Sequence, residues 1–147
     1  MSARRSCWGL LALLLVCVSE AAAGPAPVSG SWVAQAEGVR VAVPGRDTQS
    51  QALVGAVPPG AQVAGVAWQY SVPPGAQLDA WLCHPQRCVR LNAPRGRSES
   101  LAGLSADAQL RFRFRLAQGR PVQVSGLQVI VDHRRAGEPK AQKTLGH

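Results

Sequence analysis

Two cysteines stand close together near the middle of the chain, in the segment CHPQRC that runs from Cys83 to Cys88. Thiols at this spacing can form a disulfide, bind a metal or carry redox chemistry. A structural zinc site usually has four Cys or His ligands, and only His84 is near, since His133 and His147 lie far along the chain. Redox pairs are typically Cys-x-x-Cys. The pattern therefore favours a structural disulfide between the two cysteines, provided that the protein reaches an oxidising compartment.

Catalytic chemistry has no recognisable motif in this sequence. It contains no Gly-x-Ser-x-Gly, no His-Glu-x-x-His and no glycine-rich phosphate loop. The acidic residues after the first 23 positions are few, and none has the context of a paired carboxylate site. We therefore expect a protein that is not an enzyme, with no cofactor and no catalytic or metal-binding residues.

An arginine strip is the most distinctive charged feature. In Leu110–Leu116 (LRFRFRL), apolar residues alternate strictly with Arg111, Arg113 and Arg115, so a strand here turns its arginines to one face. Like charges at this spacing repel unless they are solvated or partnered. Two interpretations stay open: a surface that binds an anion or a protein partner, and a solvated face that blocks edge-to-edge aggregation.

The aromatic residues also allow two interpretations. Trp32, Trp68, Tyr70 and Trp81 could form a stacking platform for sugars on a β-sandwich, or they could fill the core. Trp68 and Tyr70 share a strand face with valines, which favours burial. Trp81 is the better candidate for an exposed ring, and we add it to the arginines as a candidate partner surface, although packing between sheets remains the simpler expectation.

The first 23 residues resemble an export signal. Arg4 and Arg5 precede the uncharged apolar run Cys7–Val18, and the small residues Ala21–Ala23 offer a cleavage site. The apolar run is short for a bilayer span, which needs about 20 residues. We therefore predict a cleaved signal peptide over residues 1–23 and no stable membrane insertion. Cleavage leaves only Cys83 and Cys88.

The chain is basic, with a formal net charge of +8. In a cytosolic protein this would suggest nucleic acid, but an exported protein would not meet it. We therefore expect no nucleic-acid partner. The charge favours either attraction to anionic surfaces or a solvated basic face without a dedicated ligand.

The body of the chain has the pattern of short strands separated by turns. Val39, Val41 and Val43 alternate with other residues, Ala52–Val57 is a second apolar run, and Val63–Val72 gives the strongest strand prediction. Further strands are expected over Leu78–Cys83, Cys88–Leu91, Leu110–Leu116 and Val122–Val131, with the CHPQRC segment as a disulfide hairpin. Residues 100–108 allow a short helical turn.

These segments predict one all-β domain, an antiparallel β-sandwich of about seven or eight short strands. The sequence VPPGAQ occurs twice, at Val57–Gln62 and Val72–Gln77, and its Pro-Gly pair suits a type II turn on each side of the central strand. We place the domain at residues 31–134, after a flexible lead-in at 24–30 and before a disordered basic tail at 135–147.

Taken together, these residues resemble the FlhE family of flagellar proteins. The resemblance runs through residues 30–134, and its most specific part is the Cys-x4-Cys pair after a Trp-x-Tyr strand, combined with the final Val-Ile-Val. The segments that carry it are Gly30-Ser31-Trp32, Val66–Tyr70, Leu82-Cys83, Arg87–Val89, Leu110–Phe112, Gln128–Val131 and Arg134.

The resemblance implies a periplasmic β-rich accessory protein for flagellar assembly, acting as a chaperone-like factor or as a regulator of the export gate. Its partner would be a flagellar component in the periplasm, such as an export-gate, rod or filament protein. The alternative hypothesis is a periplasmic module that binds carbohydrate or peptidoglycan, which rests on the sandwich prediction and the tryptophans.

Overall fold

The computed structural model describes residues 29–136. The predicted signal peptide, most of the lead-in and all but Arg135 and Ala136 of the predicted tail lie outside these residues. Nine strands form within them, with no helix that could cross a bilayer. Their bounds are β1 Gly30–Ala36, β2 Val39–Val41, β3 Asp47–Gln49, β4 Gln62–Ser71, β5 Leu78–His84, β6 Arg87–Leu91, β7 Arg95–Ser98, β8 Arg111–Leu116 and β9 Val122–Arg134.

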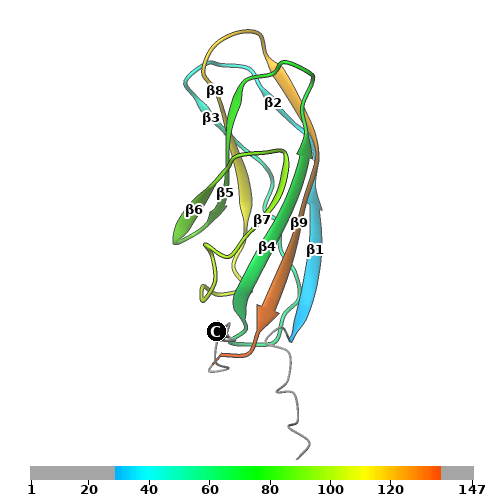
Figure 1. The fold of residues 1–147 in the computed structure, drawn as a ribbon, viewed down its shortest axis with the longest axis vertical. Coiled ribbons are helices and arrows are strands. Elements are labelled where there is room, and N and C mark those ends of the chain that lie inside the picture. The colour runs from blue at the N-terminus through cyan, green and yellow to red at the C-terminus, as the bar shows by residue number, and fades with distance from the viewer. Residues whose placement is uncertain (1–28, 137–147) are drawn as a thin grey trace, which may run out of the picture.

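The strands form two antiparallel sheets that pack face to face, which confirms the predicted all-β sandwich (Figure 1). Sheet 1 has the order β1-β9-β4-β7, with β2 pairing to β9 beyond the end of β1. Sheet 2 has the order β3-β8-β5-β6. Gly126 on β9 has a φ of 62°, in the left-handed region that favours glycine, and the pairing with β4 shifts register there. This irregularity separates the part of β9 that pairs with β1 from the part that pairs with β2.

The core lies between the sheets and is built by the alternation that the sequence shows. On β8, Phe112, Phe114 and Leu116 are almost completely buried. The ring of Tyr70 from β4 meets Phe112 and Phe114 edge-on, with centroid distances of 6.2 and 5.3 Å, and so joins the two sheets. Trp68 is also buried, and its Nε1–H donates to the Ala93 carbonyl. Burial of these rings confirms the core interpretation for Trp68 and Tyr70.

Three strands were not predicted from the sequence, because they lack a regular alternation of apolar residues. β1 has small and polar residues on both sides of Trp32 and Val33, β3 is polar, and β7 is rich in arginine. In the other direction, Ala52–Val57 is no regular strand. Leu53 forms a single bridge to Leu110, while Val54 is 54% exposed.

Two further expectations fail at turns. The strand from Val39 ends at Val41 rather than Val43, because Pro44 and Gly45 (φ 76°) turn the chain toward sheet 2. Residues 100–108 form successive turns, such as the Leu104 N–H to Leu101 carbonyl bond, and no helix.

The two VPPGAQ segments form the turns expected of them. Gly60 and Gly75 have φ of 76° and 77°, and the N–H groups of Ala61 and Ala76 donate to the carbonyls of Pro58 and Pro73 at 3.1 Å. This is the type II arrangement with proline second and glycine third. One turn precedes β4 and the other follows it, so the two turns fix the positions of both ends of this strand.

We predict that Gly96→Ala destabilises the domain by about 1–3 kcal/mol, because a Cβ there would lie 2.5 Å from Cζ2 of the buried Trp68 ring. Urea unfolding followed by tryptophan fluorescence measures the change. Arg95→Ala, an exposed neighbour on the same strand, is the control and should change stability by less than about 0.5 kcal/mol. Equal effects of both substitutions would contradict this packing.

Candidate functional site

The hairpin β5–β6 carries the predicted disulfide. Cys83 and Cys88 are directly paired across the hairpin, with a Cα–Cα distance of 4.0 Å and a bond between their sulfurs. The strands extend to His84 and Arg87, so the turn contains two residues and is shorter than the sequence suggested. The disulfide therefore holds the register of the hairpin at its tip.

His84 closes this turn and is not available as a metal ligand. It is buried; its Nδ1 accepts the Gln86 N–H at 3.1 Å, which leaves Nε2–H to donate to the Ser105 carbonyl at 3.0 Å. In residues 29–136, no group of three or more His, Cys, Asp or Glu side chains is placed to hold a metal. The histidine thus ties the hairpin to the loop before β8.

The arginines of β8 all lie on the outer face of sheet 2, as the alternation predicts. Arg111, Arg113 and Arg115 are half-buried to exposed, opposite the buried phenylalanines. The register places Arg111 beside Cys83, Arg113 beside Trp81 and Arg115 beside Asp79. The candidate residues Arg111, Arg113, Arg115 and Trp81 therefore come together on one surface. We call this surface the cationic face, and it also includes Arg90, Asp47 and Asp79.

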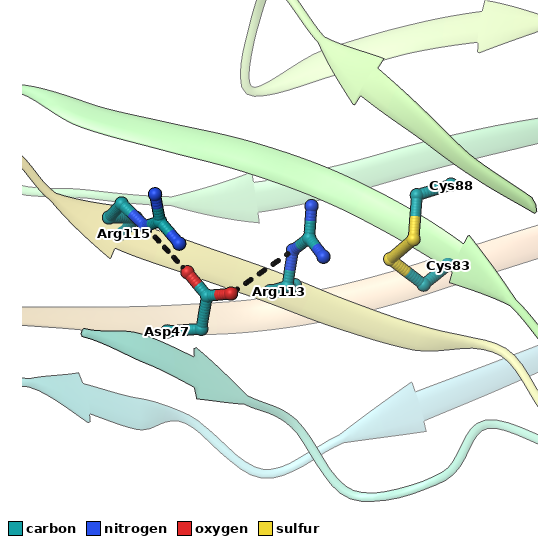
Figure 2. Close-up of polar contacts among 5 residues, drawn as sticks. All are labelled: Asp47, Cys83, Cys88, Arg113 and Arg115. Carbon is teal, nitrogen blue, oxygen red and sulfur yellow. Dashed lines mark hydrogen bonds and ion pairs between the residues drawn. A yellow bond between two sulfur atoms is a disulfide. The ribbon is translucent and has the colours of Figure 1, made fainter. Parts of the chain in front are cut away.

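Asp47 from β3 neutralises part of the arginine strip. Its Oδ1 accepts from Nε of Arg115 at 2.7 Å, and its Oδ2 lies 3.8 Å from Nε of Arg113 (Figure 2). The hydrogen bond from Arg115 holds the pKa of Asp47 below its usual value, and the carboxylate raises the pKa of Arg115 in return. One carboxylate thus keeps two arginines of the strip in fixed positions.

Trp81 lies among cations on the same face. The guanidinium carbons of Arg113 and Arg90, on the two neighbouring strands, are 4.5 and 5.7 Å from its ring centroid. Arg90 also pairs with Asp79. Such cation–π contacts are worth roughly 0.5–1 kcal/mol at exposed sites, and here they place the half-buried indole between two charges.

Sequence reasoning missed Arg90, Asp79 and Asp47 as members of this surface. Arg90 was accessible in principle, because a hairpin that pairs Cys83 with Cys88 must place residue 90 opposite Trp81. Asp47 was not, because its strand β3 has no pattern that indicates pairing with β8. Arg111 finds a partner outside the face, where its Nη1 donates to the Ser50 carbonyl at 3.0 Å.

The other tryptophans give no comparable surface. Trp32 is 7% exposed and donates its Nε1–H to the Ala106 carbonyl, and Trp68 is in the core. Of the rings proposed as a stacking platform, only Trp81 remains partly accessible in the described residues. A sugar-binding row of aromatic rings is therefore not formed.

These features define an all-β sandwich with one distinctive surface, the cationic face. Its arginines and Trp81 are held in place by ion pairs and by the disulfide hairpin. A family model described as "Flagellar protein FlhE" matches residues 38–134. A flagellar protein FlhE from Yersinia enterocolitica is 37% identical over 118 residues, covering 74% of this chain and 84% of that protein. A structure titled "Crystal Structure of FLHE" matches with a TM-score of 0.66 and 31% identity, over 72% of this chain and 97% of that one.

The chain therefore belongs to the FlhE family of flagellar proteins, as its residues had suggested. Family membership gives it a role related to the flagellum.

We predict that reducing the Cys83–Cys88 disulfide, or the double substitution Cys83→Ala with Cys88→Ala, lowers the free energy of unfolding by about 2 kcal/mol without abolishing the fold, because the closed loop is short. Thermal unfolding followed by circular dichroism measures the effect. Loss of all strand signal in the double variant would show that the hairpin is needed for folding itself.

The ion pairs of Asp47 predict a pH dependence. A carboxyl whose pKa is lowered by folding stabilises the protein above its unfolded value, near 3.8, and this contribution disappears as the pH falls through the folded pKa. Asp47→Asn should therefore be less stable than wild type at neutral pH and converge with it in strong acid. Carboxyl NMR should show the pKa of Asp47 rising toward 3.8 in Arg115→Gln. An unchanged titration would mean that the pair does not form in solution.

Proposed function

We propose that this protein is an exported, non-enzymatic accessory factor of flagellar assembly, which binds a flagellar component in the periplasm through its cationic face. Family membership supports the flagellar part of this proposal, and the signal-like residues 1–23 support export. Binding could serve either of two roles, guiding a component through the periplasm or regulating the export gate.

One observation carries the choice of surface. Arg90, Trp81 and Arg113 stand in register on three neighbouring strands, so that an indole and two guanidinium groups form a single row. Tryptophan and arginine are the residues most enriched among those that dominate binding energy at protein interfaces. Because strand pairing and ion pairs already hold this row in place, little side-chain entropy is lost when a partner covers it.

The charge of the face indicates the chemistry of the partner. Its four arginines exceed its two aspartates, so the face carries a net positive charge. A partner with an acidic surface would complement this excess. Such binding should weaken as salt is added, because exposed charges are screened.

We predict that Arg111→Glu and Trp81→Ala each weaken capture of the flagellar partner at least about tenfold and impair flagellation in a deletion strain complemented with an exported copy. Pull-down from periplasmic extract and imaging of filaments measure the two effects. Arg120→Glu makes the same charge reversal in the exposed loop between β8 and β9 and is the matched control.

Circular dichroism must show that the variants fold, and the milder Arg113→Gln tests the row without adding a negative charge beside Asp47. Wild-type flagellation and capture in all three variants would remove the cationic face from the proposal. Normal flagella in the deletion strain itself would remove the flagellar assembly role. Quenching of Trp81 fluorescence by peptidoglycan fragments, absent in Trp81→Ala, would then favour the wall-binding alternative.

A further inference from the structure

The exposed edges of the two sheets differ in how they are protected against pairing. β7 carries Arg95 and Arg97, β6 carries Arg87 and Arg90, and β3 has only three residues and includes Asp47. Short edge strands and charged side chains on them are the usual means of preventing a foreign strand from adding to a sheet. The fifth edge strand, β2, also has only three residues and includes Arg40, so four of the five edge strands are protected in this way.

β1 lacks this protection. It is seven residues long (GSWVAQA), carries no charged side chain and lies at the end of sheet 1, with no strand beyond it (Figure 1). Among residues 29–136, its backbone pairs only with β9, and no further backbone hydrogen bond reaches its seven residues from a loop. Within the part of the chain that the structure describes, its second edge therefore carries no backbone hydrogen bond and offers a place for strand pairing.

The centre of this strand is apolar and exposed. Val33 is the fourth of the seven residues and is 57% exposed, the highest value among the large hydrophobic residues described. Its neighbours on the same outer face are polar: Ser31 donates to Asp132, and Gln35 donates to Gln128. An exposed apolar side chain at the middle of an unpaired edge strand marks a surface that the domain itself does not cover.

We infer that β1 pairs with β1 of a second copy of this chain, antiparallel and with the two-fold axis at Val33. This register places Val33 against Val33 and Ser31 against Gln35 on the outer face. On the inner face it places the large Trp32 against the small Ala34, and no charge meets a like charge. A strand that is complementary to itself about its central residue fits a second copy of the same strand, which is the geometry of a two-fold interface.

The strand at the opposite edge of sheet 1, β7, is basic and cannot do the same. Pairing β7 with a second copy about Gly96 would place Arg95 opposite Arg97, and pairing about Arg97 would place that arginine opposite itself; both arrangements are repulsive. Since each copy offers one open edge, the pairing closes at two copies and does not continue into a fibre. A seven-residue strand buries less than the roughly 1,000 Å² typical of stable complexes, so the dimer should depend on concentration.

Sedimentation velocity on the full exported protein, from low micromolar to near-millimolar concentration, tests the proposal. We expect a reversible monomer–dimer equilibrium in which Val33→Lys raises the dimer dissociation constant by about tenfold or more, because two lysines would face each other across the axis. Val43→Lys is the matched control, since Val43 is 49% exposed but lies in the bend after β2, outside β1. It should leave the dissociation constant unchanged.

Cross-linking tests the register. Under oxidising conditions Val33→Cys should form a covalent dimer, because directly opposed residues of an antiparallel pair lie about 4.5–5.5 Å apart at Cα, and Val43→Cys should not. A wild-type protein that stays monomeric over the whole range, or equal effects of the two lysine substitutions, would overturn the inference. If the protein is monomeric while Val33→Lys impairs flagellation, the edge pairs with a strand of another protein and not with its own copy.

Discussion

The alternation of side chains along β8 is the constraint on which both the core and the cationic face depend. A strand turns successive residues to opposite faces, so Phe112 and Phe114 cannot enter the core unless Arg111, Arg113 and Arg115 stand on the outer face. A shift of one residue in the pairing with β5 would bury three arginines and expose both rings. The stability of the core therefore also fixes the position of the surface charges.

Residues on the neighbouring strands offset the repulsion between these arginines. Like charges at this spacing repel, and β3 supplies Asp47 between Arg113 and Arg115, while β5 supplies Trp81 beside Arg113. The pairing register of β8 with β3 and β5 sets the positions of both Asp47 and Trp81. The result is a surface that keeps an excess of positive charge in a fixed arrangement, which a flexible arginine segment would not provide.

The sequence was sufficient for those parts of the structure that follow from local pattern. The fold class, the hairpin with its disulfide, the long strands β4 and β9 and the buried face of β8 all follow from alternation, turn residues and cysteine spacing. The failures occur where pairing depends on partners distant in sequence. Asp47 meets Arg115 across 68 residues, and β1 meets β9 across about a hundred, without any signal in their own residues. Ala52–Val57 shows the converse, an apolar run that fills space beside Trp32 without forming a strand.

The open edge and the cationic face belong to different sheets, which bears on how they can act together. When two strands pair antiparallel about a two-fold axis perpendicular to the sheet, both copies keep the same face of the sheet on the same side. A dimer through β1 would therefore present both sheet 2 faces, with their arginines and Trp81, in one direction. A filament or rod component repeats its surface along an assembly, so two such faces could bind neighbouring subunits at once, and weak binding at each would be multiplied by the high effective concentration of the second. In such a dimer a modest interface at each face would be sufficient, and a weak β1 pairing would allow the complex to dissociate.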